Sequence, residues 1–290
     1  GSEAPQQDCL LFDVVARPPD IKSKSRIACY DPKGMTRKLL DTLGVSYQEV
    51  TAADDLREFD LFIVGREAID FKTEFKGVAR VPEGLNVLIF EQTSEVLEQR
   101  LGFRVQEHGL RNLFVRTPTH PALKGIEPSW LHDWRGSATL LAPYVEDGEI
   151  SDPSWRWAGF ENTRVWRSGN RGNVASVLIE KPSRGSFLPL LDGGFDLQYS
   201  PLLEFSQGRG RILFCQLDVT GRTEADPVAQ ALCSSLIHSL GAPQPEKTSR
   251  VFASGNAQFM EWLATLGLNY KTWTTESISP NDVLIVGPEA

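Results

Sequence analysis

Short apolar runs alternate with amphipathic stretches over most of the chain. RIACY (26–30), DLFIVGREA (60–68) and NVLIFEQ (86–92) each hold a nearly continuous apolar run, which is typical of strands covered on both faces. Between the first two, TRKLLDTLG (36–44) has apolar positions at helical spacing and ends on Gly44, as a helix C-terminus commonly does. Strands that alternate with helices predict a parallel sheet with right-handed crossovers, and therefore an α/β fold.

The pattern after residue 92 completes one domain. It predicts, in order, a helix at 94–102, loops with short strands at 103–173, three strands within 175–219 and a closing helix at 226–241. The turn Gln207–Gly210 joins the last two strands as a hairpin. We therefore expect a first domain over residues 25–242.

An internal repeat predicts how the chain is divided. RIACY at 26–30 recurs as RVFAS at 250–254, LGVSY at 43–47 as LGLNY at 266–270, and DLFIVGREA at 60–68 as DVLIVGPEA at 282–290. Each copy is predicted to form a strand, a helix closed by glycine and two further strands. We expect the tail of a preceding domain with a linker (1–24), the complete domain (25–242), a linker (243–249) and the truncated start of a second, similar domain (250–290). The chain would then be a fragment of a multidomain protein with tandem repeats.

Four segments carry a resemblance to a known group of proteins. They are DLFIVGREA (60–68), NVLIFEQT (86–93), TPTHPALKGI (117–126) and GRGRILFCQLDVTGR (208–222), the last followed by a helix. On these segments the chain resembles the class I glutamine amidotransferase-like superfamily. Within it, the chain is most similar to the non-catalytic domains of large bacterial glycoside hydrolases, including the trimerisation domain of some β-galactosidases; ThuA-like proteins are a looser match. The resemblance implies a flavodoxin-like fold, with a three-layer, doubly wound, mostly parallel sheet.

The residues that hydrolyse glutamine in active members have no counterpart in this sequence. The resemblance implies a cysteine in a G-x-C-x-G turn after a strand, with a later His and Glu, because the thiolate needs a helix N-terminus and a base. The matching strand end reads FEQTS (90–94), and the late strand ends in LDVT (217–220) without His-Pro-Glu. We therefore assign no catalytic residue and no cofactor, and the sequence favours a pseudoenzyme.

Polar residues after several predicted strands form a candidate ligand site. Ligands of doubly wound sheets bind outside the carboxyl ends of the strands. We expect a crevice there that hydrogen-bonds a sugar or another neutral polyol, formed by Arg66, Glu67, Glu91, Gln92, Asp218, Thr220 and Arg222. The alternative is a purely structural role, which is the more common one for polar residues at strand ends. In that case Glu91 caps the following helix and Asp218 pairs with Arg222.

Tryptophans gather in the irregular middle region. Trp130, Trp134, Trp155 and Trp157 lie near Arg, Asp and Asn residues in the sequence, and their ring faces could stack on sugars. Trp155 and Trp157 alternate as in a half-buried strand, which favours packing in the core or against another subunit over sugar binding.

Charge and composition limit the kinds of molecule that the protein is expected to bind. The formal net charge of −8 and the lack of a basic block argue against nucleic acid, and no run of about 18 apolar residues predicts a membrane span. The histidines lack the spacing of metal ligands, so no metal site is expected. No C-x-x-C pair occurs among the cysteines, which are Cys9, Cys29, Cys215 and Cys233.

The leading hypothesis is a non-catalytic structural or interaction module of a larger bacterial, carbohydrate-active multidomain protein. Its partners would be flanking domains of the same chain or further copies in a homo-oligomer. Two alternatives stay open: a module that binds carbohydrate, and a hydrolase that uses the carboxyl groups of Glu91 and Asp218. A secreted or periplasmic location follows only from the resemblance.

Overall fold

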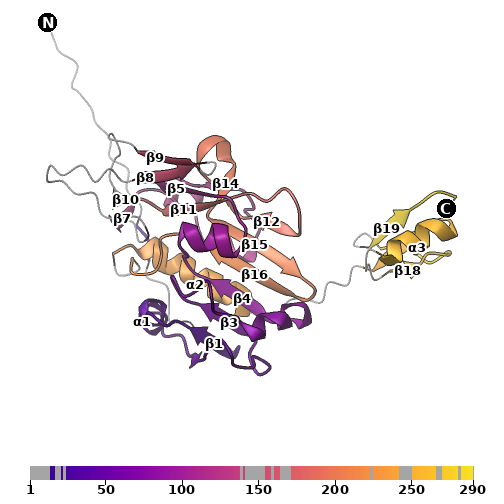
Figure 1. Cartoon of the computed structure of the whole chain (residues 1–290), viewed down its shortest axis with the longest axis horizontal. Helices are drawn as coiled ribbons and strands as arrows, with labels where there is room; N and C mark the ends of the chain where they lie inside the picture. Colours follow the sequence, from indigo (N-terminus) through magenta and orange to yellow (C-terminus); the bar gives the residue numbers. More distant parts are fainter. Residues whose placement is uncertain are drawn as a thin grey trace, which may run out of the picture. The chain divides into compact units, whose positions relative to one another are not determined.

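The computed structural model forms two compact units, unit 1 over Gly1–Ala242 and unit 2 over Pro243–Ala290. Figure 1 shows the course of the chain through each unit. The structure describes residues 14–16, 21, 24–137, 140, 171–222, 225–241, 250–265, 270–279 and 282–289, with the backbone alone at 137, 154–157, 160–163, 171 and 195. None of the described helices is long and apolar enough to cross a membrane.

Unit 1 is built on a seven-stranded sheet with the order β12-β15-β16-β4-β3-β1-β2. The strands are β1 (Ile27–Tyr30), β2 (Gln48–Glu49), β3 (Leu61–Val64), β4 (Asn86–Ile89), β12 (Phe187–Pro189), β15 (Leu202–Gln207) and β16 (Gly210–Cys215). Strands β2, β1, β3, β4 and β16 run parallel. At one edge β15 pairs antiparallel with β16, and β12 pairs antiparallel with β15. The order β2-β1-β3-β4-β16 is that of a flavodoxin-like sheet, so the predicted fold class is confirmed.

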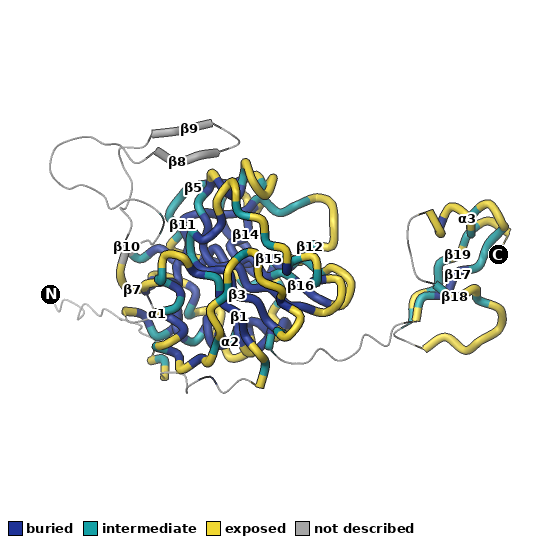
Figure 2. The backbone as a smooth tube through the Cα atoms, turned by 60° about the horizontal axis from the view of Figure 1, so that its bottom comes forward, coloured by how far each residue is buried: buried dark blue, intermediate teal, exposed yellow. Residues whose placement is uncertain are grey.

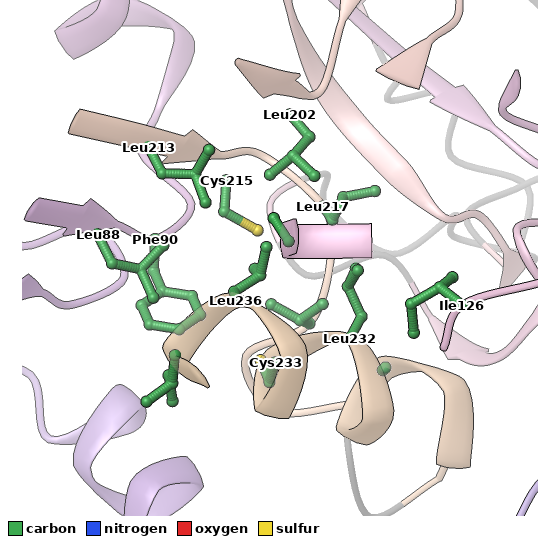
Figure 3. Close-up of a cluster of buried hydrophobic side chains, with 14 of the residues drawn as sticks. Leu88, Phe90, Ile126, Leu202, Leu213, Cys215, Leu217, Leu232, Cys233 and Leu236 are labelled. Carbon is green, nitrogen blue, oxygen red and sulfur yellow. The ribbon is translucent and has the colours of Figure 1, made fainter. Parts of the chain in front are cut away.

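Helical segments cover both faces of this sheet. Alternate residues of β3 divide between two cores: Leu61 and Ile63 belong to the core that contains residues of α1 (Met35–Thr42) and α2 (Pro227–Gly241). The other residues of β3 belong to the core of the opposite face, with residues of the 3₁₀ helix η1 (Lys76–Glu83) and the π-helical turn η2 (Val96–Arg100). Figure 2 shows how thoroughly the middle of unit 1 is buried, and Figure 3 shows side chains of β4, β16 and α2 that meet in the first core. The result is three layers.

The helix predicted at 94–102 begins at Ser94 as expected and runs to Arg100. Its last part, η2 (Val96–Arg100), is π-helical, with the Leu101 N–H bonded to the Val96 carbonyl. Gly102 then takes a left-handed conformation (φ 77°), which ends the turn.

The middle of the chain forms smaller sheets instead of joining the main one. A three-stranded antiparallel sheet has the order β14-β11-β5, in which β11 (Ala175–Glu180) is the central strand. A bridge between Ala175 and Leu217 places it beside the chain that leaves β16. The remaining elements are β5 (Val105–Leu110), β6 (Phe114–Val115), β7 (Trp134–Ser137), β8 (Ser154–Trp157), β9 (Phe160–Thr163), β10 (Arg171–Gly172), β13 (Leu191–Asp192), β14 (Tyr199–Ser200), and the 3₁₀ turns η3 (Pro121–Leu123), η4 (Pro128–Trp130) and η5 (Phe195–Leu197).

Unit 2 contains β17 (Val251–Ser254), α3 (Ala257–Thr265), β18 (Lys271–Thr272) and β19 (Val283–Val286), in a parallel sheet of order β18-β17-β19. The order matches β2-β1-β3 of unit 1. The register matches as well: Val251 pairs with Val283 as Ile27 pairs with Leu61.

A backbone clamp also recurs in both units. The Arg250 N–H donates to the Asp282 carboxylate (3.0 Å), as the Arg26 N–H donates to that of Asp60 (2.9 Å). The repeated sequence segments therefore adopt the same local structure.

We predict that the stability of unit 1 depends on the core between β4 and the helices α1 and α2. Leu88 is fully buried, so Leu88→Ala should lower the free energy of unfolding by about 2–5 kcal/mol. Leu188→Ala, at a position on edge strand β12 that is 40% exposed, should cost less than about 1 kcal/mol. Urea unfolding of the 290-residue protein measures both variants. Equal losses would contradict this assignment of the core.

Candidate functional site

The carboxyl ends of β4 and β16 bring the predicted strand-end residues together. The two strands are parallel neighbours, so their ends meet at one edge of the sheet. The side chains there do not line an open crevice. Of the predicted residues, Glu91, Gln92, Asp218, Thr220 and Arg222 are all buried, as the structural alternative expects.

Glu91 binds the loop that follows β16. Its Oε1 accepts hydrogen bonds from the backbone N–H groups of Val219 (2.7 Å) and Thr220 (2.6 Å), and its Oε2 accepts one from the Thr220 hydroxyl (2.7 Å). The expectation that Glu91 caps the following helix is therefore wrong, because both carboxyl oxygens are directed to this other loop. One side chain joins two chain segments that are far apart in the sequence.

Gln92 and Gln216 form a two-way bridge between the same strand ends. The Gln92 N–H donates to Gln216 Oε1 (2.9 Å), and Gln216 Nε2 donates to the Gln92 carbonyl (2.9 Å). The Gln92 amide also donates to the carbonyls of Gly65 (2.8 Å) and Phe90 (2.7 Å), and accepts from the Ile69 N–H (3.0 Å). This amide has used its donors and its acceptor, so it has little capacity left for a ligand.

Asp218 connects the loop to the smaller sheet. Its carboxylate accepts a hydrogen bond from the Ser176 hydroxyl on β11, and its backbone N–H donates to the Val174 carbonyl (2.9 Å). These contacts add a second attachment of the loop after β16, to residues other than Glu91.

Arg222 has buried donors without a partner in the described part of the chain. Its Nη1 donates to the Asn173 carbonyl, but its Nε and Nη2 have no hydrogen-bond partner among the described residues. Burial lowers the pKa of the Arg222 guanidinium, and the charges of Asp218 and Asp226 act against that shift. The Asn173 side-chain amide is also without a partner in the described part of the chain. This corner is the least satisfied part of the network.

Arg66 and Glu67 lie at the outer side of the site and are only half-buried. The Glu67 carboxylate accepts from Lys33 (2.5 Å) and from Arg66 Nε (3.1 Å). Burial would raise the pKa of Glu67, but the hydrogen bond from Lys33 and the charge of Arg66 lower it overall. The Glu67 N–H donates to the Glu91 carbonyl (2.8 Å), so the residue holds the loop after β3 in place.

The tryptophans do not form an aromatic platform in the described structure. Trp134 is 1% exposed, and its indole N–H donates to the Trp130 carbonyl (2.9 Å). Trp130 is partly buried against the same core. Stacking of a sugar on Trp134 is therefore excluded by its burial, while the side chains of Trp155 and Trp157 lie outside the described residues.

The described cysteines are buried and poorly suited to act as nucleophiles. Burial, with a further contribution from Asp31, raises the pKa of Cys29 to about 12. Burial also raises the pKa of Cys215 and of Cys233 well above the usual range. Among the described residues, no group of three or more His, Cys, Asp and Glu side chains could hold a metal ion.

A second buried polar cluster lies on the antiparallel part of the sheet and was not predicted. Glu204 Oε2 lies 3.3 Å from His120 Nε2 and 3.1 Å from Arg211 Nη1. Arg211 also donates to the Ser239 carbonyl near the end of α2. Burial would raise the pKa of Glu204, but the hydrogen bond from His120 and the charge of Arg211 lower it. The cluster fastens α2 to the hairpin.

We predict a pH dependence of stability that comes from Glu91. Burial raises its pKa to about 7, against the opposing hydrogen bonds from Thr220. The folded state then holds a proton that the unfolded state releases near the ordinary value of 4.5, so stability falls as pH rises from about 4.5 to about 7. The loss should reach at most about 3.5 kcal/mol, since one pKa unit corresponds to about 1.4 kcal/mol.

Glu91→Gln should remove this slope, because the amide can accept the two backbone hydrogen bonds without titrating. Glu67→Gln is the matched control and should keep it, because the pKa of Glu67 is lowered. Denaturant unfolding of all three proteins between about pH 5 and pH 8 measures the effect, because this range covers most of the interval between the two pKa values and extends past the upper one. Parallel curves for the wild type and Glu91→Gln would contradict the prediction.

No family model matches the chain, and no curated protein matches it. Solved structures to which it is similar include glutamine amidotransferase-like and ThuA-like proteins, the groups named by the sequence resemblance. One is a glutamine amidotransferase from Thermotoga maritima, with 10% identity, 75% of this chain and 97% of that chain covered, and a TM-score of 0.38.

Two further structures belong to these comparisons. A ThuA-like protein from Parabacteroides merdae has 11% identity, covers 76% of this chain and 92% of its own, and gives a TM-score of 0.37. The β-galactosidase from Bacillus circulans sp. alkalophilus has 10% identity over 76% of this chain and 32% of its own, with a TM-score of 0.41. Because these TM-scores are low, the flavodoxin-like assignment rests on the strand order β2-β1-β3-β4-β16.

Proposed function

We propose that unit 1 is a non-catalytic module that serves as a structural and interaction domain of a larger bacterial, carbohydrate-active protein. The observation that carries this proposal is the closed hydrogen-bond network at the carboxyl ends of β4 and β16. In doubly wound folds this edge is where ligands bind. Here Glu91, Gln92 and Gln216 fill it with contacts to the protein itself.

The chemistry of the buried groups supports the same proposal. A thiol nucleophile requires access and a lowered pKa, and the raised pKa values of Cys29, Cys215 and Cys233 are the opposite condition. The carboxyl groups of Glu91 and Asp218 are fully buried, which argues against a hydrolase that uses them. The hypothesis of a carbohydrate-binding module has less support than the structural one, because Trp134 and most residues of the proposed crevice are buried.

The proposal extends to unit 2. Its strand order, register and backbone clamp repeat those of β1, β2 and β3, which supports the interpretation of residues 250–290 as the start of a second such domain. Non-catalytic domains in tandem would suit a protein in which they act as spacers or as docking sites for its other domains.

We predict that the native protein does not react with thiol-directed or glutamine-mimicking electrophiles at Cys29, Cys215 or Cys233. The reason is that burial keeps each thiol protonated and out of reach. Incubation with iodoacetamide or with a diazo-ketone analogue of glutamine, followed by peptide mass spectrometry, measures modification at each cysteine. Iodoacetamide treatment after denaturation in guanidinium chloride is the positive control and should modify all three. Stoichiometric modification of one of them in the native protein, or release of ammonia from glutamine, would refute the proposal.

A further inference from the structure

A cavity of about 450 Å³ lies between two crossover segments of unit 1, away from the network around Glu91. One segment leads from β2 to β3, and the other, which contains η1, leads from β3 to β4. Its volume is in the range of small-molecule sites, which is roughly 300–1,000 Å³. Its lining is mainly charged, with Asp55, Arg57, Lys76, Arg80 and Glu83.

The two segments that enclose the cavity are attached to each other and to the core. The Lys76 N–H donates to the Ala52 carbonyl (3.3 Å). Gly77 packs so closely on Leu56 that a Cβ at position 77 would lie 2.3 Å from the Leu56 side chain. Leu56 is itself buried in the core on this face of the sheet. The cavity is therefore part of the folded unit and does not need a ligand in order to form.

The acidic residues of the cavity orient its arginines. The Asp55 carboxylate accepts from the Arg57 N–H (3.1 Å) and lies 2.9 Å from Arg57 Nε. Glu83 accepts from Arg80 Nε (3.1 Å). Arg80 Nη1 is buried and has no hydrogen-bond partner in the described part of the chain, and the Lys76 ammonium makes no ion pair with a described residue. A buried donor without an acceptor is costly, so an acceptor supplied by a ligand would be favourable here.

The charges of the lining indicate the kind of ligand. Three basic and two acidic side chains leave a surplus of one positive charge, in a protein whose net charge is −8. This surplus favours an anion. The carboxylates of Asp55 and Glu83 only accept hydrogen bonds, so the ligand must also carry donors such as hydroxyl groups. Aromatic and large aliphatic side chains are absent from the described lining, so the contacts must be mainly polar.

We propose that this cavity binds a small organic anion that carries a phosphate or carboxylate group together with hydroxyl groups. Arg57, Lys76 and Arg80 hold the anionic group, and Asp55 and Glu83 accept hydrogen bonds from the hydroxyl groups. The proposal goes beyond the function proposed for unit 1, because it does not depend on whether the strand ends bind a ligand or catalyse a reaction. It differs in both place and charge from the neutral polyol expected at the strand ends.

Isothermal titration calorimetry of the 290-residue protein tests the proposal with four probes: glucose 6-phosphate, glucuronate, glucose and inorganic phosphate. At least one of the first two should bind with a Kd of about 1 mM or tighter, and at least about tenfold more tightly than glucose and inorganic phosphate. The reason is that only these two probes combine an anionic group with hydroxyl groups. Comparison of the two identifies the anionic group as phosphate or carboxylate.

Variants locate the site. Arg57→Gln and Lys76→Gln should each raise the Kd about three- to tenfold, because each removes one charged donor from the cavity. Arg104→Gln is the matched control and should leave the Kd unchanged, since Arg104 is as exposed as Arg57 and pairs with Glu180 outside the cavity. Thermal unfolding of each variant checks that it is folded; substitutions at such exposed positions seldom destabilise a protein.

Three results would overturn the proposal. The first is that neither glucose 6-phosphate nor glucuronate binds. The second is that inorganic phosphate binds as tightly as they do, which would show a simple anion site without a role for the carboxylates. The third is an equal loss of affinity in Arg104→Gln and Arg57→Gln, which would show a general attraction of anions to the surface.

Discussion

The buried carboxyl group of Glu91 determines how unit 1 is arranged at the carboxyl ends of β4 and β16. It receives two backbone N–H groups and a hydroxyl from the loop after β16, and so fastens that loop to the end of β4. The same loop carries Asp218, which binds Ser176 of the smaller sheet, and Arg222, which binds the Asn173 carbonyl just before that sheet's central strand. Without Glu91 those N–H groups would be buried and unpaired, which is costly. The smaller sheet therefore depends on a contact made at the edge of the larger one.

This constraint also explains why the strand-end edge does not present a ligand site. A flavodoxin-like sheet leaves polar groups at the carboxyl ends of its strands, where they are available for binding. In this protein Glu91, Gln92 and Gln216 are satisfied by backbone groups and by each other. The donors left over are those of Arg222 Nε and Nη2, which are buried beside carboxylates. The geometry holds chain segments together and provides no exposed reactive group among these residues.

The sequence predicted the sheet well because apolar runs and helical periodicity are local signals. It also predicted that Glu91, Gln92 and Asp218 lie together, since parallel strand ends meet at one edge. It left open whether they are buried, which depends on the smaller sheet formed by residues distant in the chain. Gln216 and Ser176 were missed for that reason, although Gln216 follows β16 much as Gln92 follows β4. The burial of Trp134 agrees with the packing role that the sequence favoured for the tryptophans over sugar binding.

The central claim is that Glu91 closes the strand ends by holding the loop after β16. Hydrogen exchange of the Val219 and Thr220 amides, followed by NMR in the 290-residue protein, tests it most directly. If the claim is correct, both amides are protected to nearly the same degree as those of β4 and β16, because they are buried and bonded to one carboxyl group. Exchange at the rate of an open loop would show that the edge is accessible, and would contradict the account.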